Sequence, residues 1–138
     1  MKLENQVVSL DLAKRLKELG VKQESAFMWL QRKPETADEK PYWYLKGNGQ
    51  WPVGMKIYNS VSAFTVAEVG KMLPNYIHFL KTQAGKHLVR WTETEASEVI
   101  DAGRYHQELA DTEADARAKM LIHLLENKLI ALQSTMQS

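Results

Sequence analysis

The four histidines have the widest chemical range of any side chains in this sequence, because imidazole can transfer protons near neutral pH or bind a metal ion. They are His78, His87, His106 and His123. Metal-binding histidines commonly stand four residues apart on a helix or lie among carboxylates. None of the four has such a neighbour in the sequence, so we predict neither a metal site nor a bound cofactor.

Nucleophilic catalysis also lacks a recognisable motif. The sequence contains no cysteine, which excludes thiol catalysis, disulfide bonds and cysteine-based zinc sites. No serine lies in a Gly-x-Ser-x-Gly motif, and the glycine-rich segment 47–54 lacks the Lys-Ser/Thr pair of a phosphate-binding loop. The acidic run 93–101 is typical of a solvated loop. We predict no catalytic residues, although His106 and Glu108 stay open as enzyme candidates if a pocket surrounds them.

The aromatic residues are the most distinctive group, with four tryptophans and five tyrosines. Alternation along a strand would put Tyr42 and Tyr44 on one face and Trp43 on the other. Core and sheet packing is the favoured interpretation; the alternative is an exposed patch that binds a protein partner or stacks on single-stranded nucleic acid beside lysines. The residues predicted to bind, around the loop 46–54, are Arg32, Lys33, Trp43, Lys46 and Trp51.

The elements that must position these residues begin with a helix over residues 9–19. Gly20 follows at the position that favours a left-handed backbone, and Val21 is placed to contact Leu16 in a Schellman ending. A short helix over 66–73 is marked by a capping box, Thr65 with Glu68, and by a hydrophobic staple, Phe64 with Val69. Strand-like segments are predicted at residues 25–31, 42–46, 55–61 and 104–110.

Segment 76–93 is predicted to be a β-hairpin with a tight turn at Ala84-Gly85, which would place His78 opposite Trp91. Segment 92–103 is ambiguous between an acidic loop and a frayed helical turn. The last helix, over 112–126, is the clearest: Thr112 caps it and Asn127 is placed to end it. Its predicted core face consists of Ala114, Ala118, Leu121 and Leu125.

The predicted fold is therefore a single α+β domain over residues 1–130, followed by a frayed tail over 131–138. An antiparallel sheet of about four to five strands packs against two main helices and one short helix, in the order α-β-β-α-β-β-β-α. Because some 45 residues separate the first two predicted helices, a helix-turn-helix unit for DNA binding is excluded.

Composition narrows the function classes. The 138 residues carry 18 Lys and Arg against 17 Asp and Glu, a formal net charge of +1, whereas proteins that bind nucleic acid non-specifically usually show a basic excess. The sequence has neither an apolar run long enough to span a bilayer nor a signal peptide, so we expect a cytoplasmic protein without membrane contact.

Three segments together resemble a family of small proteins encoded by phages and prophages of bacteria. They are "SLDLAKRLKELGVKQES" (9–25), "SAFTVAEVGKMLP" (62–74) and "ADTEADARAKMLIHLLEN" (110–127), about a third of the chain. The resemblance implies a bacterial or phage setting, and it implies no reaction and no functional residues. Our leading hypothesis is a non-enzymatic accessory or interaction protein that acts through a protein partner or self-association; the alternative is nucleic-acid binding through a local basic and aromatic face.

Overall fold

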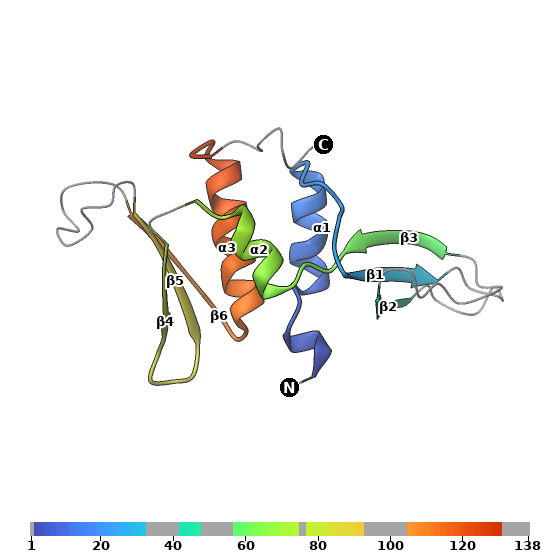
Figure 1. Ribbon diagram of the computed structural model, residues 1–138, viewed down its shortest axis with the longest axis horizontal. Coiled ribbons are helices and arrows are strands. Elements are labelled where there is room, and N and C mark those ends of the chain that lie inside the picture. Colours follow the sequence, from blue (N-terminus) through green and yellow to red (C-terminus); the bar gives the residue numbers. More distant parts are fainter. Residues whose placement is uncertain (1, 33–41, 48–56, 75–76, 93–104, 131–138) are drawn as a thin grey trace.

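The computed structural model describes residues 2–32, 42–47, 57–74, 77–92 and 105–130. Three α-helices lie between two antiparallel sheets of three strands each, which form the two ends of the molecule (Figure 1). The described elements, in chain order, are the 3-10 helix η1 (Leu3–Asn5), α1 (Leu10–Glu18), β1 (Phe27–Arg32), β2 (Tyr42–Gly47), β3 (Ile57–Ser62), α2 (Val66–Met72), β4 (Ile77–Lys81), β5 (His87–Thr92), β6 (Tyr105–Ala110) and α3 (Glu113–Glu126).

The predicted α+β class is confirmed, but the strands are arranged differently from the expectation of one sheet. The strand order is β2-β1-β3 in the first sheet and β4-β5-β6 in the second. The segment expected to be only briefly extended is a full strand, β3, which pairs with β1. Because α2 follows β3 directly, the chain leaves the first sheet before β4 begins the second sheet. The predicted tail, residues 131–138, and the ambiguous segment 92–103 beyond Thr92 lie outside the described residues.

The first helix ends as its sequence predicts. Gly20 has a positive φ of 91°, and its amide donates to the Lys17 carbonyl at 3.0 Å. The Val21 amide donates to the Leu16 carbonyl at 3.1 Å, and both side chains are buried, which completes the Schellman ending. At the other end, the Ser9 amide donates to the Asp115 carboxylate at 2.7 Å, so α1 begins against the first turn of α3.

The second helix is short and depends on its cap. The Thr65 hydroxyl accepts from the Glu68 amide, and the Glu68 carboxylate accepts from the Thr65 amide, so both halves of the predicted capping box are present. Phe64 and Val69, the predicted staple, are both buried in one core cluster. A helix of two turns persists here because tertiary packing supports it.

The last helix is shared between two cores. Thr112 caps α3 through a hydrogen bond from the Asp115 amide, as predicted. One side of α3 packs against α1 and α2, and the other side packs against β5 and β6 of the second sheet, so its buried surface is wider than the predicted face. Residues toward the first core are Ala114, Ala118, Leu121 and Ile122, and residues toward the second are Ala116, Met120 and Leu124. The left-handed residue that ends the helix is Lys128, one position later than predicted.

The hairpin of β4 and β5 has a different turn from the one predicted for segment 76–93, and this changes its register. His78 lies opposite Arg90, and Lys81 lies opposite His87. The loop has three residues between Thr82 and Lys86, whose backbones pair, and Gly85 occupies its last position with a positive φ of 82°. Glycine is required there, as expected, but in a three-residue loop rather than a two-residue turn.

Candidate functional site

The structure describes the side chains of two of the five residues predicted to bind. Trp43 and Lys46 both lie on β2, three positions apart, so strand alternation puts them on opposite faces. Arg32 ends β1, and its side chain is not among those described. Lys33 and Trp51 lie outside the described residues.

Trp43 faces α1. The ammonium of Lys14 on that helix lies 4.8 Å from the centroid of the Trp43 ring, a cation–π contact. Trp43 also packs against the first core, in agreement with the favoured interpretation that one aromatic face of β2 serves the core.

The opposite face of β2 carries tyrosines and an exposed lysine. The rings of Tyr42 and Tyr44 lie 6.1 Å apart between centroids, tilted by 48°, and Tyr42 is 50% exposed. Lys46 is exposed two positions further along the same face. A groove of about 650 Å³ follows this strand and is bordered by residues of both faces, namely Glu4, Trp29, Tyr42, Trp43, Tyr44, Leu45 and Lys46.

The second sheet has one face on the helices and one face turned away from them. Val89 and Trp91 are buried toward α3, so their strand neighbours Leu88 and Arg90 point to the outer face. The register sets Leu80, Leu88 and Leu109 side by side across β4, β5 and β6. We refer to these three residues as the leucine row.

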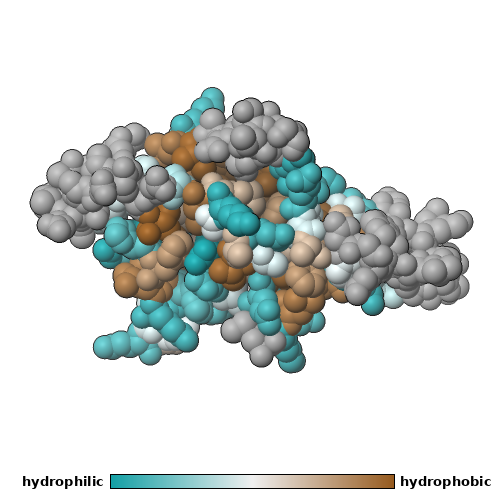
Figure 2. Space-filling model, in the orientation of Figure 1, coloured by the Kyte–Doolittle hydropathy of each residue, from teal (hydrophilic) through white to brown (hydrophobic). Residues whose placement is uncertain are grey.

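The leucine row is accessible at both ends. Leu80 is 53% exposed and Leu109 is 48% exposed. Figure 2 shows hydrophobic surface over the second sheet, on the left of the view. The next row of residues across the same face is polar, because His78 lies opposite Arg90 and Arg90 lies opposite Gln107. The side-chain oxygen of Gln107 accepts a hydrogen bond from the Arg90 guanidinium at 3.2 Å.

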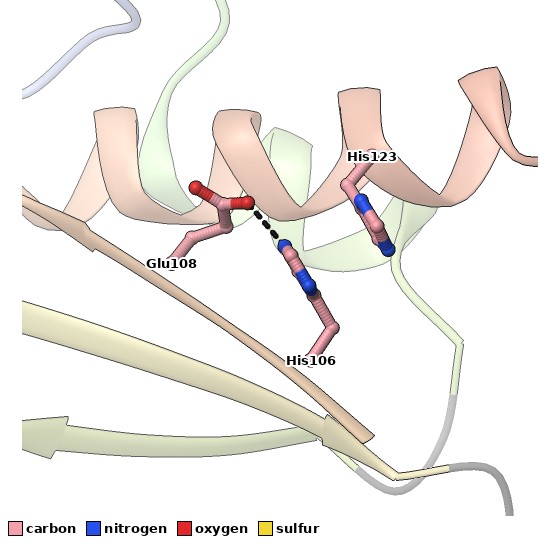
Figure 3. A group of neighbouring side chains, drawn as sticks. All are labelled: His106, Glu108 and His123. Carbon is pink, nitrogen blue, oxygen red and sulfur yellow. Dashed lines mark hydrogen bonds and ion pairs between the residues drawn. The ribbon is translucent and has the colours of Figure 1, made fainter. Parts of the chain in front are cut away.

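A cluster of three chemically active side chains lies on the inner face of the second sheet. Figure 3 shows His106 and Glu108 on β6 and His123 on α3, with the carboxylate hydrogen-bonded to Nε2 of His106. The two imidazole rings stack with centroids 3.4 Å apart and planes within 4°. One ligand atom from each of the three residues lies within 4.8 Å of the others. The sequence places no suitable ligand beside any histidine, whereas the folded chain brings these three side chains together.

The electrostatics of the cluster favour neutral His123. Burial lowers the pKa of the His123 imidazole, and the nearby His106 lowers it further, while Glu108 and Glu126 act in the opposite direction. Nδ1 of His123 lies 3.2 Å from the Asn127 amide nitrogen. Because that amide is only a donor, Nδ1 accepts, and the proton of the neutral ring sits on Nε2.

Part of this cluster carries a signal in the sequence. His106 and Glu108 are two positions apart in a segment predicted to be a strand, so alternation alone places them on one face. His123 has no such signal, because its position depends on how α3 packs across the sheet. The sequence could therefore have indicated a pair but not the group of three.

A further hollow of about 600 Å³ lies where the starts of α2 and α3 meet the N-terminal segment. The residues that line it include Phe27, Val66, Asp111 and Glu113. Asp111 is ion-paired with Lys86, and Glu113 with Arg117. Each of the two carboxylates is therefore paired with a cation of the same chain.

Comparison with protein-family models, with curated proteins and with solved structures gives no significant match to this chain. In the part of the chain that the structure describes, no helix is long and apolar enough to cross a membrane.

Proposed function

We propose that this protein is a non-enzymatic interaction module that associates through the outer face of its second sheet, with a second copy of the chain as the occupant. The observation that carries the proposal is the leucine row, which lies in register across three strands with its two ends about half exposed. Burial of the remaining area of each end leucine would contribute roughly 1 kcal/mol.

The geometry of the row suits pairing with itself. A two-fold axis parallel to β5 would place Leu80 of one copy opposite Leu109 of the other, with Leu88 facing its own equivalent. The same axis places Arg90 of one copy opposite Arg90 of the other, and although each guanidinium donates to Gln107 of its own sheet, this contact between like charges weakens the pairing. The formal net charge of +1 gives little repulsion between copies.

The size of the face determines how tightly two copies are expected to bind. Three strands of five or six residues present a surface of roughly 17 by 14 Å, below the roughly 800 Å² per partner of a standard interface. We therefore expect a weak, concentration-dependent dimer rather than an obligate one.

Sedimentation velocity from micromolar to millimolar protein tests the proposal. The wild type should shift from monomer toward dimer, and Leu80→Glu should remain monomeric at every concentration. Tyr42→Glu is the matched control, because it places the same charge at an equally exposed position, 50% against 53%, on the other sheet. A wild type that stays monomeric at millimolar concentration, or a Leu80→Glu variant that dimerises normally, contradicts the proposal.

Nucleic-acid binding is the second candidate, supported by the face of β2 that carries Tyr42, Tyr44 and Lys46. Two tyrosine rings with an exposed lysine beside them offer stacking surfaces for bases and a cation for phosphate. Titration with mixed-sequence single- and double-stranded DNA, followed by tryptophan fluorescence, tests it. Binding should be tighter for the single strand, fall steeply as salt rises, and weaken in Tyr44→Ala and Lys46→Gln. Equal binding by these variants contradicts it.

We propose that the protein acts in the cytoplasm of a bacterial cell, including a cell that a phage has infected or that carries a prophage. The support for this setting is the resemblance of residues 9–25, 62–74 and 110–127 to phage and prophage proteins. Capture of partners from lysogenic or infected cells, with Leu80→Glu as the comparison, would test this setting directly.

A further inference from the structure

We infer that His106, Glu108 and His123 form a binding site for a divalent transition-metal ion of the class that includes zinc. The site is separate from the leucine row, because it lies on the inner face of the second sheet, between β6 and α3 (Figure 3). The ligands are one ring nitrogen from each histidine and one carboxylate oxygen.

The donor set determines the class of ion. Two imidazole nitrogens with one carboxylate oxygen suit zinc and its neighbours in the first transition row, whereas magnesium and calcium select oxygen ligands. The sequence has no cysteine, so no thiolate within the chain competes for a soft metal. Three protein ligands leave a fourth tetrahedral position for water, and the cluster is open enough to admit it, with the His106 side chain 31% exposed and that of Glu108 26% exposed.

The distances require a small local contraction. Zinc bonds of about 2.0–2.2 Å place tetrahedral ligand atoms roughly 3.3 Å apart, whereas the present ligand atoms lie within 4.8 Å of one another. Rotation of side chains can supply this difference because all three groups are terminal and partly exposed. The backbone of β6 and α3 already places the three side chains within reach of one ion.

Metal binding must also separate the stacked imidazole rings of His106 and His123. Two parallel rings direct their nitrogen lone pairs side by side, whereas a metal ion needs lone pairs that converge on it. One imidazole must therefore turn away from its present orientation. If His106 binds the ion through Nε2, the proton of the neutral ring moves to Nδ1, and the ion takes the place of the hydrogen in the contact with Glu108. If binding uses Nδ1 of His123, the ion also replaces the hydrogen bond from Asn127.

The alternative is a purely structural cluster, in which the stacked rings and the His106–Glu108 pair hold α3 on the sheet. Under that alternative, loss of either histidine lowers stability but leaves zinc without effect on the protein. Zinc titration therefore distinguishes the two roles.

Isothermal titration calorimetry of the full chain, without a polyhistidine tag, provides the main test. Zinc chloride should bind the wild type at one site. His106→Gln and His123→Gln should each weaken binding by more than the roughly 10- to 100-fold typical of losing an outer-shell partner. His78→Gln is the matched control and should bind as the wild type does, because His78 lies on the outer face of the same sheet.

Two further readouts keep the test independent of folding defects. Cobalt in place of zinc should give visible absorption typical of four-coordinate nitrogen and oxygen ligands, and should quench Trp91, which pairs directly with His106 across β5 and β6. Circular dichroism confirms that each variant is folded. A wild type that binds no zinc, or a His106→Gln/His123→Gln double variant that binds it as tightly as the wild type, overturns the inference.

Discussion

The Glu68 carboxylate accepts a hydrogen bond from the hydroxyl of Ser25, 43 residues earlier in the chain, at 2.7 Å. The same carboxylate accepts from the Thr65 amide at 2.8 Å and from the Ala26 amide at 3.0 Å. One residue therefore caps α2 and fixes the segment that enters β1 to the start of that helix. A motif that the sequence predicts as local has a tertiary role as well.

Glu68 should make the protein sensitive to acid. Burial raises the pKa of this carboxyl, but hydrogen bonds from Ser25, Thr65 and Ala26 outweigh that effect, so its pKa lies below its ordinary 4.5. A lowered folded-state pKa gives a contribution to stability that is complete above the unfolded-state value and is lost as the pH falls through the folded-state value. Glu68→Gln should cost about 1–2 kcal/mol at neutral pH, with the difference from wild type shrinking below about pH 4.5.

Urea denaturation of both proteins between pH 7 and pH 3 measures this difference. Glu24→Gln is the matched control, because the Glu24 side chain is 72% exposed and its ion pair with Lys22 lies at the surface. A difference between Glu68→Gln and wild type that stays constant across this range would contradict the assigned cause.

The helix ends were predictable because their signals are local. The capping box at Thr65 and the Schellman ending at Gly20 each involve residues within one or two turns. The division into two sheets was not predictable, because it depends on β3 pairing with β1 instead of joining the later hairpin. Hydrophobic pattern identifies strands, but it does not specify which strand lies beside which.

The candidate sites show the same limit. The leucine row depends on the register of β4 and β5, and a two-residue turn at Ala84-Gly85 would have displaced that register by one residue. The metal-binding group depends on His123, which α3 brings to β6 only in the folded chain. Both features depend on strand pairing and helix packing, which the residue types alone do not determine.

Because α3 contributes buried residues to both cores, substitution of a buried residue near its centre should lower the stability of the protein strongly. Leu121 is fully buried, so Leu121→Ala should lower the free energy of unfolding by about 2–5 kcal/mol. Leu125→Ala is the matched control on the same helix, because Leu125 is only partly buried, and its loss should be smaller. Denaturation midpoints at pH 7 compare the two; a loss below about 1 kcal/mol for Leu121→Ala would mean that this residue is not central to the core.

The hairpin loop gives a prediction that depends on backbone conformation alone. Gly85 has a φ of 82°, and an added Cβ would meet nothing within 4 Å. Gly85→Ala should therefore cost about 1–2 kcal/mol through the left-handed backbone rather than through a clash. Gly85→Asn should cost less, because asparagine tolerates that conformation. Thermal unfolding measures the loss of stability in both variants. Equal losses for alanine and asparagine would contradict the assigned backbone strain.

Gly70 and Arg117 form a pair whose coupling can be measured. Alanine at position 70 should stabilise an ordinary helix by up to about 1 kcal/mol. Here its Cβ would overlap Nη1 of Arg117, so the guanidinium must move. That movement disturbs the contact of Arg117 with the Phe79 ring, 3.9 Å from its centroid, and the ion pair with Glu113 at 2.8 Å.

We therefore expect Gly70→Ala to give no gain, or a loss, in the wild-type protein and a gain of about 1 kcal/mol in an Arg117→Ala background. The double-mutant cycle, measured by urea denaturation, should show a coupling of about 0.5–3 kcal/mol between the two positions. If Gly70→Ala stabilised both backgrounds equally, Arg117 would have another position of equal free energy. The absence of a side chain at Gly70 would then have no role in seating the guanidinium over Phe79.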